Sequence, residues 1–262
     1  MKEQLSVIKI GGNVIDDTAS LQRFLDQVSS LNGPCILVHG GGKLATSLAA
    51  DLQVPQQMVE GRRITDEATL KIVTMVYAGY INKNIVALLQ ARGCAALGLS
   101  GADGNLIQAH KRTGTQQDYG FAGDIDAVNE TLCTGLLQQG YTLVVAPITH
   151  DREGQLLNTN ADTIAQELAQ ALSRQYSVRL IYCFEKSGVL RDTEDESSRI
   201  AAINKTTFSS LKAEGVIYAG MLPKLDNAFA ALDKGVDRVV IGKWSDLPQL
   251  VSGQNGTTIS HE

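Results

Sequence analysis

Two segments of the chain decide the fold: LSVIKIGG, residues 5–12, and CILVHGGG, residues 35–42. Each is a short apolar run that ends in glycines. Each is followed by apolar residues at helical spacing, over 21–31 and 44–52. Strands that alternate with helices in this way predict a mainly parallel sheet with helices on both faces. We therefore predict an α/β fold.

The same alternation continues along the chain. Helices are expected over 129–139, 161–172 and 221–234, and strands over 142–147, 178–183, 238–241 and 257–260. Residues 104–127 break the rhythm with several glycines, which predicts hairpins laid over the sheet. The helical stretch 66–92 is unusually long, and we expect either a kink near Gly79 or a face packed against a second subunit. A soft boundary is placed near residue 175.

Composition excludes several classes of protein. The 262 residues are 44% hydrophobic, which is too high for a disordered chain. The net charge of -5 argues against a general nucleic-acid binder. No apolar run approaches a membrane span, and the N-terminus lacks a signal-peptide pattern. The four cysteines are scattered without a CxxC pair, so we expect free thiols in a cytoplasmic protein.

The glycine turns lie where ligands bind parallel sheets, at the carboxyl ends of strands. Glycine lets the backbone approach a phosphate, and the following helix offers free N–H groups. An ordinary tight turn is the alternative, chiefly for 11–12. The chain has neither GxxxxGK[ST] nor GxGxxG after its first strand. The HGGG of 39–42 occurs in lipases, but those enzymes need a GxSxG nucleophile that this sequence lacks.

Several polar residues stand where an anion could be bound. Lys9 lies near the carboxyl end of the first strand, and Lys224 lies early in a helix, where a cation opposes the helix dipole. Arg62 and Arg63 form a pair at an expected turn before a helix, and such a pair can clamp a carboxylate. In the segment 158–162, the middle asparagine fits a helix cap and the final aspartate fits the first turn. For each lysine and arginine, simple exposure to solvent is the alternative interpretation.

In their order along the chain, these motifs resemble those of the amino-acid kinase family. The resemblance covers nearly the whole sequence. The matching segments are 9–13, 38–42, 61–66, 99–106, 118–124, 158–162 and 220–224.

The resemblance implies a fold and a reaction. The fold is a three-layer α/β/α open, mainly parallel sheet with β-hairpins over the substrate site. It comprises an N-terminal lobe, 1–175, for the acylated amino acid and dimerisation, and a C-terminal lobe, 176–262, for ATP. The reaction transfers the γ-phosphoryl of ATP to the side-chain carboxylate of an N-acyl-glutamate, a step of arginine biosynthesis. Mg²⁺ is implied with ATP, held mainly by phosphate oxygens and water, so no protein ligand is named.

The resemblance also assigns roles to single residues. Lys9 and Lys224 are expected to hold the phosphoryl group from its two sides, and Asp162 to orient both lysines. Arg63, rather than its neighbour, matches the arginine that binds the substrate α-carboxylate, and Asn158 is an expected donor to the substrate. The expected backbone donors are Gly11, Gly12, Gly41 and Gly42. The ATP-binding turn is expected over 185–190, with Glu185, Ser187 and Gly188.

The sequence departs from the family pattern at a few positions. Arg62 stands where leucine is usual, the run 182–186 is atypical, and Ala219 replaces a common glycine. An extra arginine near the substrate could suit a larger anionic acyl group such as succinyl. Arginine-inhibited members carry a helix before the first strand, which here starts by Leu5. We therefore expect no arginine feedback, and a homodimer with the helix 66–92 at its interface.

Two other classes of function are compatible with parts of this sequence. A sibling kinase would act on carbamate, aspartate, glutamate or UMP, whereas the segments 61–66 and 158–162 favour an N-acyl-glutamate. A non-catalytic amino-acid or nucleotide sensor would not need both Lys9 and Lys224.

Overall fold

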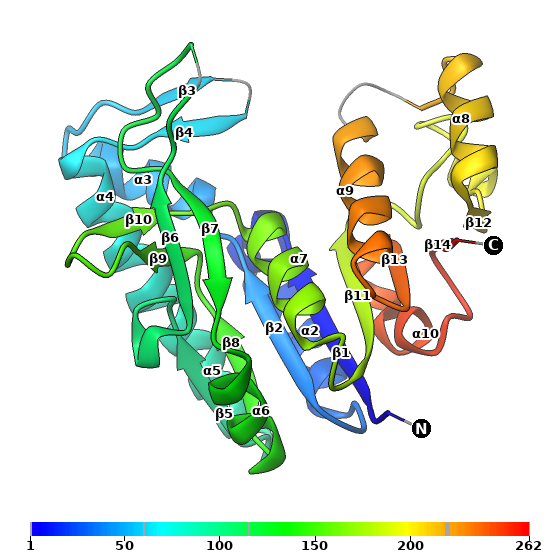
Figure 1. Ribbon diagram of the computed structural model, residues 1–262, viewed down its shortest axis with the longest axis horizontal. Helices are drawn as coiled ribbons and strands as arrows, with labels where there is room; N and C mark the ends of the chain where they lie inside the picture. The colour runs from blue at the N-terminus through cyan, green and yellow to red at the C-terminus, as the bar shows by residue number, and fades with distance from the viewer. Residues whose placement is uncertain (1, 60, 115, 218–220, 262) are drawn as a thin grey trace.

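The central sheet of the computed structural model has eight strands and is built around β1 (Figure 1). The structure describes residues 2–59, 61–114, 116–217 and 221–261. From one edge to the other the strands are β12 (Ala202–Ile203), β14 (Thr257–Ile259), β13 (Arg238–Lys243), β11 (Ser177–Phe184), β1 (Gln4–Ile10), β2 (Cys35–His39), β8 (Thr142–Val145) and β5 (Ala96–Leu99). Neighbouring strands run parallel except β13 and β14, which are antiparallel.

Helices cover both faces of this sheet, because its central strands are apolar on both sides. In β1, Leu5 and Val7 are buried in one apolar cluster, and Ile8 and Ile10 are buried in the other. The first cluster includes residues of α6 (Glu130–Gln138), α7 (Ala161–Leu172), α8 (Lys205–Ala213) and α9 (Leu222–Asp233). The second includes residues of α1 (Gly12–Asp16), α2 (Thr18–Ser29), α3 (Gly42–Asp51), α4 (Glu67–Thr74), α5 (Asn82–Gln90) and α10 (Leu247–Ser252). The predicted three-layer α/β/α fold is confirmed.

Two smaller sheets lie beside the main one. A four-stranded sheet has the order β10 (Leu156–Asn158), β9 (Ile148–His150), β6 (Ile107–Lys111) and β7 (Gly123–Val128). A hairpin joins β3 (Gln57–Val59) to β4 (Arg62–Ile64). Figure 1 shows this hairpin and the β6–β7 hairpin together at the end toward which β2 points.

The long helical stretch is a single helix from Glu67 to Gln90. Its N-cap is Asp66, whose side chain accepts a hydrogen bond from the N–H of Thr69. Between α4 and α5 it widens into a π-helical segment, η1 (Met75–Ile81), which includes the glycine where a kink was expected. By length and composition the helix could span a membrane, with a mean hydropathy of 1.4. However, most of its apolar residues join the second core cluster, and core helices of soluble proteins meet the same criteria.

The structure corrects some of the local predictions. Arg62 and Arg63 lie in β4, within a hairpin, and not at a turn before a helix. In that strand successive side chains alternate, so the first arginine is exposed and the second is buried. The residues after Gly11 form the short helix α1 and not a simple turn. Ala219 and Gly220 lie outside the described residues.

Candidate active site

Three charged side chains from three separate elements converge at one end of the sheet. Lys9 comes from β1, Asp162 from the first turn of α7, and Lys224 from the first turn of α9. Lys9 Nζ lies 2.7 Å from Asp162 Oδ1, and Lys224 Nζ lies 3.6 Å from Asp162 Oδ2. The structure therefore brings together the three residues whose catalytic role was predicted.

The charges of this cluster shift the pKa values of Asp162 and Lys224. Burial by itself would raise the pKa of Asp162, but the charges of Lys9 and Lys224 outweigh it and lower that pKa below its usual value. The pKa of Lys224 is lowered, chiefly by burial and further by Lys9, although Asp162 opposes the shift. The carboxylate is therefore ionised at neutral pH, while Lys224 holds its proton less tightly than an ordinary lysine.

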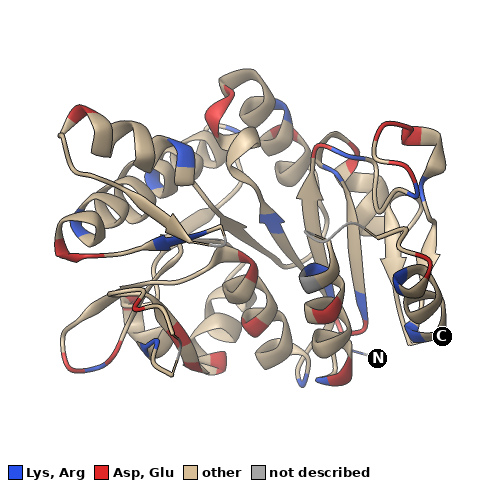
Figure 2. Cartoon of the chain, turned by 90° about the horizontal axis from the view of Figure 1, so that it is seen from above, with Lys and Arg blue, Asp and Glu red and all other residues tan. Residues whose placement is uncertain are grey.

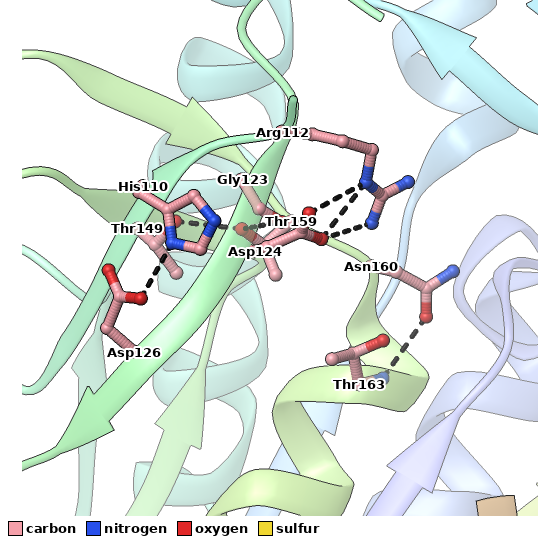
Figure 3. A network of polar contacts seen from close by, with 9 residues as sticks. All are labelled: His110, Arg112, Gly123, Asp124, Asp126, Thr149, Thr159, Asn160 and Thr163. Atoms are coloured by element: carbon pink, nitrogen blue, oxygen red, sulfur yellow. Dashed lines mark hydrogen bonds and ion pairs between the residues drawn. The ribbon is translucent and has the colours of Figure 1, made fainter. Parts of the chain in front are cut away.

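The backbone before Asp162 is fixed by a helix cap. The side chain of Asn160 accepts hydrogen bonds from the N–H groups of Asp162 and Thr163, at 2.8 and 3.2 Å. Figure 3 shows this cap at the start of α7. The cap uses the Asn160 side chain, whereas the Asn158 side chain takes no part in it.

An aromatic ring that the sequence analysis did not assign lies against both lysines. Phe184 ends β11, and its ring centroid lies 4.1 Å from Lys224 Nζ and 5.7 Å from Lys9 Nζ. The ring stacks on Tyr182, with 6.5 Å between the centroids. Because β11 pairs with β1, the ring reaches the end of the sheet that carries Lys9. The sequence did contain a signal for this contact. Phe184 is an aromatic residue directly after a predicted strand, and it lies within the atypical run 182–186.

The two glycine turns are neighbours in space. The parallel pairing of β1 with β2 aligns Ile10 with His39, so the turns that follow them lie side by side. A Cβ placed on Gly40 would lie only 3.9 Å from the backbone nitrogen of Gly12. Gly41 and Gly11 act as N-caps of α3 and α1, and neither cap forms a side-chain hydrogen bond. The N–H groups at these starts are thus available to a ligand.

Gly41 is the position where the turn requires glycine. Its φ of +150° is rare for residues with a side chain. A Cβ there would lie 2.2 Å from Cδ1 of Ile81, in the π-helical segment. The long helix therefore packs directly against the glycine turn.

A cavity of about 200 Å³ opens beside this turn. It is lined by the glycine turn after β2, by both hairpins and by the loop that leads into α7. Its lining includes all four residues predicted to bind the substrate: Gly41, Gly42, Arg63 and Asn158. Arg62 also lines it.

Arg63 is held rigidly in the wall of the cavity. The side chain is buried, and its Nη2 donates to the carbonyl of Gly42 at 3.0 Å and to the hydroxyl of Thr46 at 2.9 Å. Its Nη1 donates to the side chain of Gln56. Asn158 is fixed as well, since its Nδ2 donates to the hydroxyl of Thr65 at 3.0 Å.

The β6–β7 hairpin adds a third arginine that the sequence analysis missed. Arg112 lines the cavity, and its Nε donates to both carboxylate oxygens of Asp124, at 3.0 and 3.1 Å. This hydrogen bonding lowers the pKa of Asp124 and raises that of Arg112. Figure 3 shows the two side chains facing each other across the hairpin. Their pairing depends on hairpin register, which a local sequence pattern does not show.

The comparisons with known proteins agree with this geometry. The model of the amino acid kinase family matches residues 4–243. The chain belongs to this family. The resemblance found in the motifs is thereby confirmed.

The chain is similar to two curated acetylglutamate kinases over nearly its whole length. It is 54% identical to the acetylglutamate kinase of Bacteroides fragilis over 241 residues, covering 92% of each chain. It is 51% identical to that of Bacteroides thetaiotaomicron over 259 residues, covering 99% of each. Among solved structures, N-acetylglutamate synthase from Neisseria gonorrhoeae, complexed with coenzyme A and N-acetyl-glutamate, has a TM-score of 0.83 at 23% identity. That match covers 99% of this chain and 60% of that one, and it shows the fold alone.

The turn expected to bind ATP in this amino acid kinase is only partly next to the lysines. Glu185 is exposed, and its charge acts on Lys224. The N–H of Ser187 donates to the Glu196 carboxylate at 2.9 Å. Gly188 packs against β14, where a Cβ would lie 2.5 Å from the hydroxyl of Thr257. That close packing explains this glycine, and the nucleotide contacts of the turn stay a prediction.

Within the described part of the chain, no group of three or more His, Cys, Asp or Glu residues could hold a metal ion. The four cysteines are all described, and all are free thiols.

Proposed function

We propose that this chain transfers the γ-phosphoryl group of ATP to the side-chain carboxylate of N-acetyl-L-glutamate, in arginine biosynthesis. The product is the 5-acyl phosphate. The observation that carries the proposal is the Lys9–Asp162–Lys224 cluster, which lies next to the Ala161 end of a cavity that also contains Arg63. The identity of more than half with acetylglutamate kinases, over nearly the full chain, supports the choice of acceptor.

The main task of such a site is to bring two anions together. The acceptor carboxylate is already ionised at neutral pH, so the reaction needs no general base. Lys9 and Lys224 offset the charge of the moving phosphoryl group, and Asp162 keeps both ammonium groups aimed at it. The N–H groups of Gly41 and Gly42 add donors from the uncapped start of α3.

The two substrates are proposed to approach from different lobes. The acyl-glutamate occupies the cavity in the lobe 1–175, with its α-carboxylate on Arg63 and Asn158 as a further donor. ATP occupies the lobe 176–262, where Lys224 and the turn at 185–190 lie near the carboxyl end of β11. Gly11 and Gly12 lie between them, beside the glycine turn of β2.

Mg²⁺ is proposed to arrive with ATP. The carboxylate at the centre of the cluster, Asp162, is already engaged by two ammonium groups. The donor set of the chain therefore fits an ion held by phosphate oxygens and water. Such an ion offsets phosphate charge when it is bound.

Arg62 is the residue that could decide which acyl group the substrate carries. This arginine is exposed and lines the cavity, whereas Arg112 is already paired with Asp124. A longer anionic acyl group such as succinyl could therefore meet the guanidinium of Arg62, whose charge also acts on Asp124. A solvent-facing side chain without effect on the substrate is the alternative.

Trapping of the acyl phosphate with hydroxylamine tests the function. The enzyme is incubated with ATP, Mg²⁺ and a panel of acceptors that includes acetyl- and succinyl-glutamate, glutamate, aspartate, carbamate and UMP. We expect a hydroxamate with an N-acyl-glutamate and little product with the other acceptors. ATP turnover with any of those instead would identify a sibling kinase, and no turnover at all would favour a sensor. Equal acetyl-to-succinyl ratios for the wild type and Arg62→Ala would exclude a role for Arg62.

A homodimer in the cytoplasm is proposed for the assembly and its location. On the long helix, Met75 and Tyr80 expose 54% and 65% of their surface, which is unusual for large apolar side chains. A second copy of the chain could cover them. The free thiols are typical of a reducing compartment.

A further inference from the structure

A buried histidine lies directly beneath the glycine turn, and the mechanism above does not use it. His39 ends β2 and has no exposed surface. Burial lowers the pKa of His39 to about 4, with an opposing effect of its hydrogen bond to Gly40. The imidazole is therefore neutral at physiological pH, so one ring nitrogen donates and the other accepts.

The partners of the ring determine which nitrogen carries the proton. Nδ1 lies 2.9 Å from the carbonyl oxygen of Gly40, which can only accept, so Nδ1 is the donor. Nε2 lies 3.2 Å from Nδ2 of Asn82 and therefore accepts. Asn82 is itself buried and donates to the carbonyl of Val144 at 2.9 Å. Lys83 Nζ donates to Oδ1 of Asn82 at 3.2 Å, which fixes the orientation of the amide.

The chain of hydrogen bonds thus runs from Lys83 through Asn82 and His39 to the Gly40 carbonyl. In a trans peptide the C=O and the following N–H point in opposite directions. Because the Gly40 carbonyl is held toward the buried ring, the N–H of Gly41 points away from the core. Gly41 lines the cavity, so this N–H faces the side where the substrates are expected.

We propose that His39 and Asn82 are positioning residues that aim the Gly41 N–H at the transferring phosphoryl group. The proposal rests on the proposed phosphoryl transfer. The neutral Nδ1–H tautomer of His39 is the form that holds the peptide in place, and Asn82 selects this tautomer by donating to Nε2. The long helix, to which Asn82 belongs, thereby sets the orientation of a donor in the site.

A pair of substitutions at one position tests this role. In His39→Asn, the amide nitrogen can take the place of Nδ1 and still donate to Gly40. In His39→Leu, the volume is similar but the donor is gone. We expect His39→Leu to lower kcat by about 10- to 100-fold with little change in KM, because a misaimed donor weakens the transition state. His39→Asn should retain kcat within about threefold of the wild type.

Ser173→Ala serves as the control for lost buried polarity. Ser173 is buried at the far end of α7, where its hydroxyl donates to the carbonyl of Gln170 at 2.7 Å. Its loss should lower the melting temperature without changing kcat. Equal kcat losses in His39→Leu and His39→Asn, or an unchanged kcat in a folded His39→Leu, would overturn the proposal.

Nitrogen-15 NMR of histidine provides a measurement that does not depend on activity. In the wild type we expect His39 with a protonated Nδ1 and a bare Nε2, and no titration between about pH 5 and 8. In Asn82→Leu the Nε2 partner is lost, so the two tautomers should mix and the Gly41 amide resonance should shift. An Nε2–H tautomer in the wild type would refute the inference even if acyl phosphate forms. The absence of acyl phosphate with the expected tautomer would instead count against the proposed function.

Discussion

Lys9 and Lys224 place two positive charges near one another. The carboxylate of Asp162 offsets the repulsion between them. Each ammonium contacts a different oxygen of the carboxylate. The ring of Phe184 adds a second shared partner with a negative face. The two cations proposed to bind phosphate are thus held in place by side chains of the chain itself.

Removing either lysine should affect the chemical step far more than the fold. In Lys9→Ala and Lys224→Ala we expect kcat to fall by about 10²–10³-fold, since each variant loses one charge that stabilises the transition state. Steady-state kinetics and thermal melting measure the two effects. Lys71→Ala is the control, because its ion pair with Glu67 is exposed. Near-normal turnover in a lysine variant would remove that lysine from the mechanism.

Phe184→Leu should make the ammonium groups of Lys9 and Lys224 less well positioned without removing either charge. A cation–π contact contributes about 0.5–2 kcal/mol, so we expect kcat to fall by about two- to thirtyfold. Phe208→Leu is the matched control: Phe208 also pairs with an aromatic ring and a lysine, but it lies on α8. If both variants change kcat equally, the ring of Phe184 affects activity only through the stability of the fold.

The lowered pKa of Lys224 predicts an alkaline limit of activity. Deprotonation removes its charge, so kcat/KM, which reports the free enzyme, should decline below the usual lysine pKa of about 10.4. Lys224→Arg cannot lose its proton in this range. In a pH profile, the residual kcat/KM of that variant should persist to higher pH than the kcat/KM of the wild type. An identical alkaline decline in both enzymes would assign it to another group.

At the scale of elements, the long helix connects the site with a surface. Its π-helical segment packs Ile81 against Gly41, and its exposed side carries Met75 and Tyr80. One element thus lies both at the glycine turn and at the proposed interface between subunits.

Charges on the exposed side of this helix should separate the subunits. We expect the double variant Met75→Glu, Tyr80→Glu to have about half the wild-type mass in light scattering, because two carboxylates oppose burial against a second copy. Leu52→Glu is the control, since this residue is 53% exposed but lies just after α3. A monomeric or hexameric wild type would contradict the proposed dimer.

Elements with a local cause were predictable from the sequence. The helix at 161–172 was bounded correctly because Asn160 caps it, and the glycine turns follow buried strands. By contrast, the strand nature of 62–64 comes from its pairing with β3, and Arg112 meets Asp124 through hairpin register. Contacts between distant segments, such as that of Phe184 with Lys224, have no local pattern. The convergence of the lysines on Asp162 was anticipated only through the order of the family motifs.

At the scale of the whole molecule, the net charge of -5 hides a local concentration of cations. Figure 2 shows basic and acidic residues interspersed along the outer helices and loops. Lys9 and Lys224 converge on Asp162 only through the fold, and Asp162 directly follows Ala161, which lines the same cavity as Arg63. The proposed anionic substrates should therefore be attracted by these few cations and not by the net charge of the protein.

The proposed binding of the two substrates to different lobes predicts that each substrate protects a different part of the chain from hydrogen exchange. N-acetyl-glutamate should slow exchange at the glycine turn 40–42 and in both hairpins, because these line the cavity. A non-hydrolysable ATP analogue should slow exchange at 184–190 and at the start of α9. Lys71→Ala provides the control, because its exposed ion pair with Glu67 lies outside the cavity lining. Protection by the nucleotide confined to 1–175 would refute the assignment of lobes.

The position of β1 in the sheet has a consequence for biogenesis. It precedes both of its neighbours, β2 and β11, in the chain and is therefore synthesised before them. The second neighbour is separated from it by more than half of the chain. During synthesis one edge of the buried strand β1 therefore stays unpaired until β11 has been made, and unpaired strand edges promote aggregation. High contact order also slows folding, so this enzyme should depend on chaperones more than its final stability would suggest.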